Sequence, residues 1–232
     1  MNSQSTSEFR SEIFRLSDEA VNIYIEQYPT FATHMGSSLN QDKLDDYSLE
    51  HHEAAASLFR DVLEQLKQLS PIDEIDEIAK SVMTERLETH LSLHDSRENY
   101  VAFGAIVSPA SELRQVFELM PHETEEQIEN IESRLRDLPR ALRSWRSCLE
   151  TVYGEGHKTA RRQVLLVSEQ LRTSSQGVYQ EYVARFSTSP ALIEAAKIAE
   201  AGALEMADWM RDVVAPNAAP EDAVGKDRYV LW

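Results

Sequence analysis

Apolar residues recur with the period of an α-helix along almost the whole chain. The first stripe follows a segment with the form of a helix capping box at residues 5–8 and consists of Phe9, Ile13, Leu16, Ala20 and Tyr24. We expect this helix to end by Tyr28, because Pro29 disfavours helical geometry in the residue before it. Residues 29–48 are rich in glycine, serine, asparagine and aspartate, which predicts one longer loop.

Helix starts are marked repeatedly further along the chain. An apolar stripe over residues 52–66 predicts a second helix. A Ser-Pro pair suits a cap followed by the first helical residue, and it occurs at Ser70-Pro71, Ser108-Pro109 and Ser189-Pro190. Residues 124–127 form a further capping box. Because the connections between these helices are short, the sequence predicts an all-α fold, an antiparallel bundle of about seven to eight helices.

The C-terminal half has fewer interruptions. One apolar pattern crosses Pro139 and predicts either a kinked helix or two abutting helices. The next pattern runs over residues 164–186, and Gly177 is its one weak point. An alanine-rich final helix should end near Pro216. Residues 100–107 could form a strand, but they have no evident partner strand, and we expect buried, irregular chain there.

No internal repeat or long linker divides the chain, so we expect one helical domain over residues 1–215 and a C-terminal tail over residues 216–232. Composition agrees with a helical interpretation. The 232 residues include only seven glycines and eight prolines, which disfavours a turn-rich β fold, and 42% are hydrophobic, enough to form a core.

Charge narrows the classes of partner. There are 40 acidic and 23 basic residues, giving a formal net charge of −17. Such a field repels polyanions, so we expect neither nucleic acid nor an anionic membrane surface as a partner, and solubility explains the acidity. Cys148 is the only cysteine, which excludes an intrachain disulfide, and its register favours a buried, inert thiol. With no targeting segment or apolar span evident, we expect a cytoplasmic protein.

Two histidines one helical turn apart, His90 and His94, are the weak candidates for metal ligands. A zinc-protease helix would carry glutamate directly after the first histidine, where this chain has Leu91. The apolar stripe in which the pair lies favours partly buried, hydrogen-bonded histidines instead. The segment from His51 to Glu53 begins like the same motif but lacks its closing histidine. We therefore assign no catalytic, cofactor-binding or metal-binding residue from local chemistry.

Several short motifs, in their order along the chain, resemble a bacterial family called domain of unknown function 885. They are residues 28–36 (YPTFATHMG), 44–48 (LDDYS), 134–139 (RLRDLP), 156–162 and 224–229 (VGKDRY), and together they span almost the whole chain. The family-like positions within them are Tyr28, Pro29, Gly36, Asp46, Leu138, Pro139, Gly225, Arg228 and Tyr229.

The resemblance implies helical zinc peptidases. Family members resemble proteins with two motifs. The first is a His-Glu pair followed by a Pro-Gly-His turn, and the second, further along, is a Glu-Gly-Trp-Ala segment. Both motifs lie beyond the Gly-x-x-x-Tyr motif, and neither complete motif occurs in this sequence. The resemblance therefore carries over no catalytic or metal residue, and we expect zinc only if a complementary half is supplied. What carries over is a helical N-terminal part that packs over and shapes the substrate cleft.

Three functional hypotheses follow. The first is a helical N-terminal module of a zinc-peptidase-like protein, not catalytic by itself. The second is one half of a split metallohydrolase, completed by a second polypeptide that carries the metal site. Its motivation is the apolar residues at 229–232, which could equally support self-association. The third is an acidic helical scaffold or binding protein whose charged faces meet a basic partner.

Overall fold

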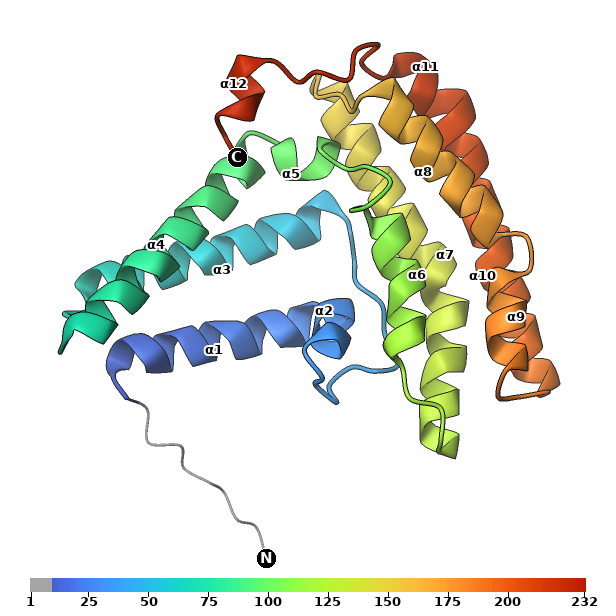
Figure 1. Ribbon diagram of the computed structural model, residues 1–232, viewed down its shortest axis with the longest axis horizontal. Coiled ribbons are helices and arrows are strands. Elements are labelled where there is room, and N and C mark those ends of the chain that lie inside the picture. The colour runs from blue at the N-terminus through green and yellow to red at the C-terminus, as the bar shows by residue number, and fades with distance from the viewer. Residues whose placement is uncertain (1–9) are drawn as a thin grey trace, which may run out of the picture.

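The computed structural model describes residues 10–232 and places most of them in helices (Figure 1). The predicted all-α class is confirmed, and eight of the helices have at least seven residues. In chain order the elements are α1 (Glu12–Gln27), α2 (Pro29–His34), α3 (Leu49–Gln68), α4 (Glu74–Asp95), α5 (Glu98–Val101), α6 (Pro109–Leu119), α7 (Glu125–Gly154), α8 (Arg161–Ser174), α9 (Val178–Ala184), α10 (Pro190–Trp209), the π-helical turn η1 (Met210–Val214), α11 (Ala215–Asn217) and α12 (Lys226–Tyr229).

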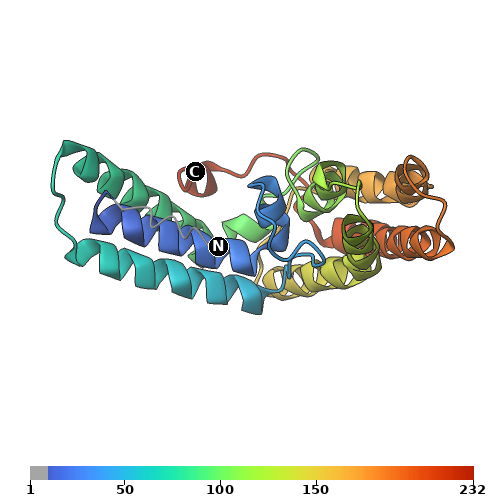
Figure 2. The same cartoon turned by 90° about the horizontal axis from the view of Figure 1, so that it is seen from below.

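The helices form two groups. Helices α1, α3 and α4 pack together through a small apolar cluster of Ile13, Leu16, Val62 and Leu66. The second group consists of α6 to α11, with α7 and α10 packed along each other. The short helices α2 and α5 contact both groups. Figure 2 shows the groups end to end, which gives the molecule an elongated shape.

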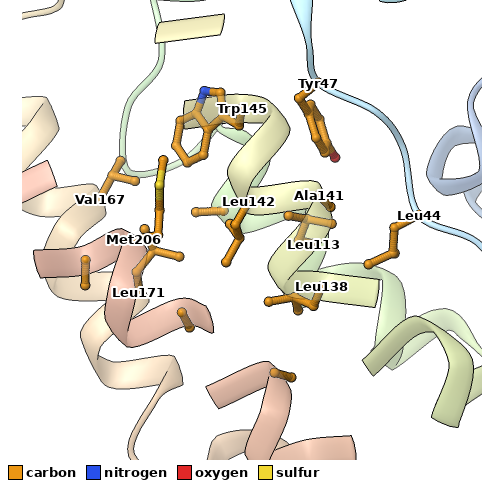
Figure 3. Close-up of a cluster of buried hydrophobic side chains, with 14 of the residues drawn as sticks. Leu44, Tyr47, Leu113, Leu138, Ala141, Leu142, Trp145, Val167, Leu171 and Met206 are labelled. Carbon is orange, nitrogen blue, oxygen red and sulfur yellow. The ribbon is translucent and has the colours of Figure 1, made fainter. Parts of the chain in front are cut away.

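The larger core surrounds α7. Leu138, Leu142 and Trp145 project from this helix toward side chains of α8 and α10 such as Leu171 and Met206 (Figure 3). Figure 3 also shows Leu44 and Tyr47, from the segment before α3, on the other side of α7. The apolar face of α7 therefore packs against α8 and α10 on one side and against the segment before α3 on the other.

Helix α7 runs without a break through Pro139, so of the two predicted arrangements the structure excludes two separate helices. The proline ring lies against Gly202 of α10, and a Cβ built on that glycine would be 2.8 Å from Pro139 Cγ. The absence of a side chain at Gly202 allows α10 to approach the backbone of α7 at this point.

Three boundaries differ from those predicted. The predicted loop over 29–48 is wrong for residues 29–34, which form α2 because Pro29 suits a first helical position and the Asp45 carboxylate accepts from the backbone N–H of Thr30. Helix α4 begins at Glu74 rather than at Pro71, because Asp73 accepts from the N–H of Asp76 and is the cap. The third difference is a helix end at Gly177, within the pattern predicted over residues 164–186.

Gly177 adopts a positive φ of 92° and separates α8 from α9, so the predicted weak point is a helix end. The predicted capping pairs at Ser108-Pro109 and at Thr124–Gln127 are confirmed, and each forms a reciprocal capping box. Ser189 also occupies a cap position, although its side chain makes no capping hydrogen bond. The capping segment predicted at residues 5–8, and Phe9, lie outside the described residues; α1 is capped by Ser11.

The segment after α11 folds back along the second group. Ala219 donates its N–H to the carbonyl of Thr159, and its own carbonyl accepts from Arg161 N–H, which makes one isolated bridge. Apart from this bridge, residues 10–232 contain no paired strands. Of the predicted irregular residues 100–107, residues 102–107 are irregular, but the prediction is wrong for Tyr100 and Val101, which belong to α5. Ile106 and Val107 are exposed rather than buried. Across the described part of the chain, every helix is too short or too polar to span a membrane.

Candidate binding pocket

A pocket of about 290 Å³ lies where the two helix groups meet, and it receives residues from α1, α3, α4, α5, α6 and α7. We call it the aromatic pocket. Its hydrogen-bonding side chains include Tyr24, Tyr28, His52, His90, Tyr100 and Glu112. The side chains that line it are up to 208 positions apart in sequence, between Tyr24 and Trp232, so the pocket exists only in the folded chain.

Aromatic rings form much of its wall. The rings of Tyr24 and Tyr28 stack with their centroids 4.3 Å apart. His52 and Tyr100 lie ring to ring at 4.9 Å, and Trp145 of α7 adds its indole. In Figure 3, Trp145 and Tyr47 lie near the same end of the core cluster. The aromatic pocket is thus continuous with the larger core.

The tyrosine hydroxyls of the aromatic pocket are neutral donors. Burial raises the pKa of Tyr24 to about 12, and it raises the pKa values of Tyr28 and Tyr100 further. Tyr47 is buried, and burial again raises its pKa well above the ordinary value. At neutral pH these groups can donate hydrogen bonds to a ligand but cannot act as phenolate bases.

The two histidines of the aromatic pocket are neutral as well. Burial lowers the pKa of His52 to about 4, with further lowering from the neighbouring His51 and His94. Burial also lowers the pKa of His90, whose ring meets Phe59 edge to face at 4.7 Å. Uncharged imidazoles can donate or accept a hydrogen bond without placing positive charge in the aromatic pocket.

Glu112 is the one carboxylate among the described residues that line the aromatic pocket, and no Lys or Arg accompanies it. Burial raises its pKa, and the nearby Asp45 raises it further. The hydroxyl of Tyr47 donates to its Oε2 over a long 3.4 Å. Sequence reasoning missed Glu112, because an acid in the first turn of a helix is ordinarily explained by the helix dipole.

The metal candidate His94 has both ring nitrogens engaged by other protein groups. His94 is almost completely buried, with Nδ1 2.5 Å from the Tyr100 hydroxyl and Nε2 3.0 Å from Glu53 Oε2. Both of its ring nitrogens therefore have protein partners. Within residues 10–232, no three His, Cys, Asp or Glu side chains are grouped to hold a metal ion. The described donor set does not fit zinc.

Cys148 also lines the aromatic pocket. Its thiol is buried, as the sequence predicted, and burial raises its pKa to about 12. A thiol that stays protonated at neutral pH is a poor nucleophile and a poor metal ligand.

Of the family-like positions, only Tyr28 lines the aromatic pocket. Others shape the chain nearby: Pro29 begins α2, Gly36 has a φ of 72°, and Asp46 accepts from the N–H of Ser48 at 2.8 Å. Leu138 belongs to the core around α7.

The C-terminal family-like positions hold the last segment in place. Gly225 has a φ of 80° and precedes α12. Arg228 then donates from Nε and Nη2 to the two carboxylate oxygens of the buried Glu98, at 2.8 and 2.7 Å. Tyr229 is exposed. This bidentate pair ties the segment after residue 220 to α5, beside the aromatic pocket.

A buried arginine, Arg134, holds the segment before α3; we call its set of hydrogen bonds the Arg134 clamp. Arg134 of α7 is fully buried and donates to the carbonyls of Lys43, Pro29 and Asn40 and to the Thr33 hydroxyl. Its position between Ile131 and Leu138 on the apolar face is the signal in the sequence, since arginine is rarely buried.

The family model described as "Bacterial protein of unknown function (DUF885)" matches residues 29–232. The chain belongs to the DUF885 family. The match begins at α2 and includes α12, so it contains every motif that carried the resemblance except Tyr28 itself. None of the curated proteins compared with this DUF885 chain matches it.

Acid is expected to destabilise the protein through His52. Its pKa is about 4 in the fold and 6.5 when free, so the unfolded chain binds the proton first as pH falls. The stabilisation is complete above pH 6.5 and is lost toward pH 4; at pH 4.5 about 2 kcal/mol should be gone. Urea denaturation at pH 7 and 4.5 measures this loss.

His52→Gln is the matched comparison, because it removes the titrating group and leaves its neighbours His51, His90, His94 and Asp46. Because the pKa values of Glu112 and Asp45 are raised in the fold, these two groups make the protein more stable as pH falls. They are present in both the wild type and the His52→Gln variant. The difference between the two pH dependences therefore isolates His52. Equal losses in the two proteins would show that His52 is not responsible.

Proposed function

We propose that this chain is the cleft-shaping helical module of a zinc-peptidase-like protein, binding substrate without catalysing its hydrolysis by itself. The observation that carries the proposal is the aromatic pocket between the helix groups. Its rings and hydroxyl donors suit binding, whereas His52 stays neutral, Glu112 has no paired second carboxylate in the lining, and the Cys148 thiol is inert. Membership of the DUF885 family supports the helical-module part of the proposal.

The expected result is peptide binding without turnover. A mixture of fluorescent peptides should bind the purified chain, as measured by anisotropy, and mass spectrometry should find the peptides intact. Ala102→Trp adds bulk to the wall of the aromatic pocket at an exposed position and should weaken binding at least about tenfold, a loss of about 1.4 kcal/mol. Ala54→Trp, exposed on α3 and outside the lining, is the control and should bind normally.

Hydrolysis by the chain alone that a chelator abolishes would overturn the non-catalytic proposal. The experiment also tests the split metallohydrolase, which the exposure of Tyr229, Val230 and Trp232 favours, since Trp232 also borders the aromatic pocket. Here the chain is mixed with zinc and a polypeptide that carries the His-Glu and Glu-Gly-Trp-Ala segments. Turnover that appears only in the mixture supports this second proposal, and its absence contradicts it.

A further inference from the structure

The aromatic pocket contains a carboxylate that the protein does not neutralise. Within the described residues, Glu112 has no Lys, Arg or His nitrogen within ion-pair distance. Its one side-chain partner is the Tyr47 hydroxyl at 3.4 Å. Removing a carboxylate from water without a close cation is costly. An incoming cation would offset part of this cost.

On balance, the titratable groups around Glu112 favour a positive charge beside it. The buried Asp45 adds a second negative charge nearby, and only His34 acts weakly in the other sense. The imidazoles of His52 and His90 are neutral at physiological pH, so they do not repel a cation. The net charge of −17 extends the same preference over the whole molecule.

The walls supply the second element of cation recognition. Tyr24, Tyr28, Tyr100 and Trp145 line the same pocket as Glu112. The face of an aromatic ring attracts an ammonium or guanidinium group, most strongly where water is excluded. At about 290 Å³ the space suits a group the size of one amino-acid side chain rather than a large cofactor.

We propose that the aromatic pocket binds an organic cation, a primary ammonium or a guanidinium on an aliphatic stem, with Glu112 as its counter-ion. The inference deepens the proposed function, on which it rests, by naming the substrate class: peptides with a lysine or arginine side chain. A free amine carries the same ammonium group as a lysine side chain. The test therefore distinguishes a peptide ligand from a free amine.

Calorimetry with paired ligands tests the proposal. N-acetyl-lysine methylamide should bind the wild-type chain at least about tenfold more tightly than N-acetyl-norleucine methylamide, which has a similar stem and no charge. A hexapeptide with one central lysine, and its norleucine analogue, form the second arm. Tighter binding of the lysine hexapeptide than of the small derivative identifies a peptide as the source, and equal binding identifies a free cation.

Glu112→Gln should reduce the preference for lysine over norleucine to less than about twofold while leaving norleucine binding unchanged. Glu118→Gln is the matched control, because it removes one charge from the same helix at an exposed site outside the lining. Circular dichroism checks that both variants fold. The wild-type ligand ratio needs no variant, so the proposal is tested even if Glu112→Gln is unstable.

Equal affinities of the wild-type chain for lysine and norleucine ligands would overturn the inference, as would equal losses in the two variants. These failures are distinct from failure of the proposed function. Peptides that bind intact whatever their charge refute the cation preference and leave the module proposal standing. Chelator-sensitive hydrolysis of lysine peptides refutes the non-catalytic module and leaves the cation preference standing.

Discussion

Arg134→Met is expected to lower the free energy of unfolding by about 3–5 kcal/mol, although methionine fills a similar space. The guanidinium is fully buried and donates from Nε to the Lys43 carbonyl at 2.8 Å and from Nη2 to the Thr33 hydroxyl at 2.9 Å. Burial lowers its pKa to about 10, so it is charged at neutral pH. Methionine would leave these oxygens without their donor, away from water. Urea denaturation at pH 7 measures the change.

Arg136→Met is the control for this substitution. Arg136 lies on the same helix two residues later, where its partly exposed guanidinium pairs with Glu132. The loss there should be about 1 kcal/mol or less, since exposed ion pairs contribute little. Arg134→Lys keeps a positive charge but has one short ammonium in place of the fork, and it should lie between the two. Equal losses for the two methionine variants would show that the clamp on residues 29–43 is not what Arg134 contributes.

The hydrogen bonds of Arg134 also help to position residues at the aromatic pocket. Arg134 holds the backbone on both sides of the turn that leads from α2 to Tyr47. Arg140, six residues later on the same helix, donates to the carbonyls of Leu44 and Asp45 at 2.8 and 3.2 Å. Tyr47 donates its hydroxyl to Glu112, and Asp45 raises the pKa of Glu112. The α7 arginines therefore position the electrostatic neighbours of the pocket without lining it.

Local sequence signals predicted most helix ends and failed where a distant contact decided the outcome. The Ser108 and Thr124 caps depend on residues three positions away, and both form as predicted. Helix α2 depends on Asp45, fifteen residues later, whose carboxylate accepts from Thr30. Nothing in the composition of residues 29–34 indicates that contact. The π-helical turn η1 at the end of α10 was likewise not indicated by the apolar period.

The aromatic pocket was beyond sequence reasoning for the same reason. The apolar stripes placed Tyr24 and His52 on helix faces that should be buried, and both are partly buried. Which faces meet depends on how the α1, α3 and α4 group contacts α6 and α7, and the periodicity of one helix does not contain that information. Glu112 becomes part of a pocket only because the two helix groups contact each other there. An acid in the first turn of a helix is common and does not by itself indicate a site.

Gly202→Ala is expected to destabilise the protein by about 3 kcal/mol, although alanine is the better helix former by about 1 kcal/mol. The added Cβ would lie 2.8 and 2.9 Å from Pro139 Cγ and Cβ, and 3.1 Å from its Cα. The last contact is with backbone, which no rotamer change can move. Relief requires α7 and α10 to separate across the interface that holds the larger core together. Thermal and urea denaturation measure the loss.

Gly154→Ala is the matched control, since Gly154 ends α7 and a Cβ there meets nothing within 4 Å. The same substitution should therefore be neutral or stabilising by up to about 1 kcal/mol at that site. Pro139→Ala then tests whether the proline ring or the backbone of α7 blocks a side chain at residue 202. It removes Cγ but keeps Cβ and Cα, so Gly202→Ala should remain destabilising by more than about 1 kcal/mol when combined with it. Full rescue by Pro139→Ala would show that the proline ring alone, and not the close approach of two helix backbones, requires glycine at residue 202.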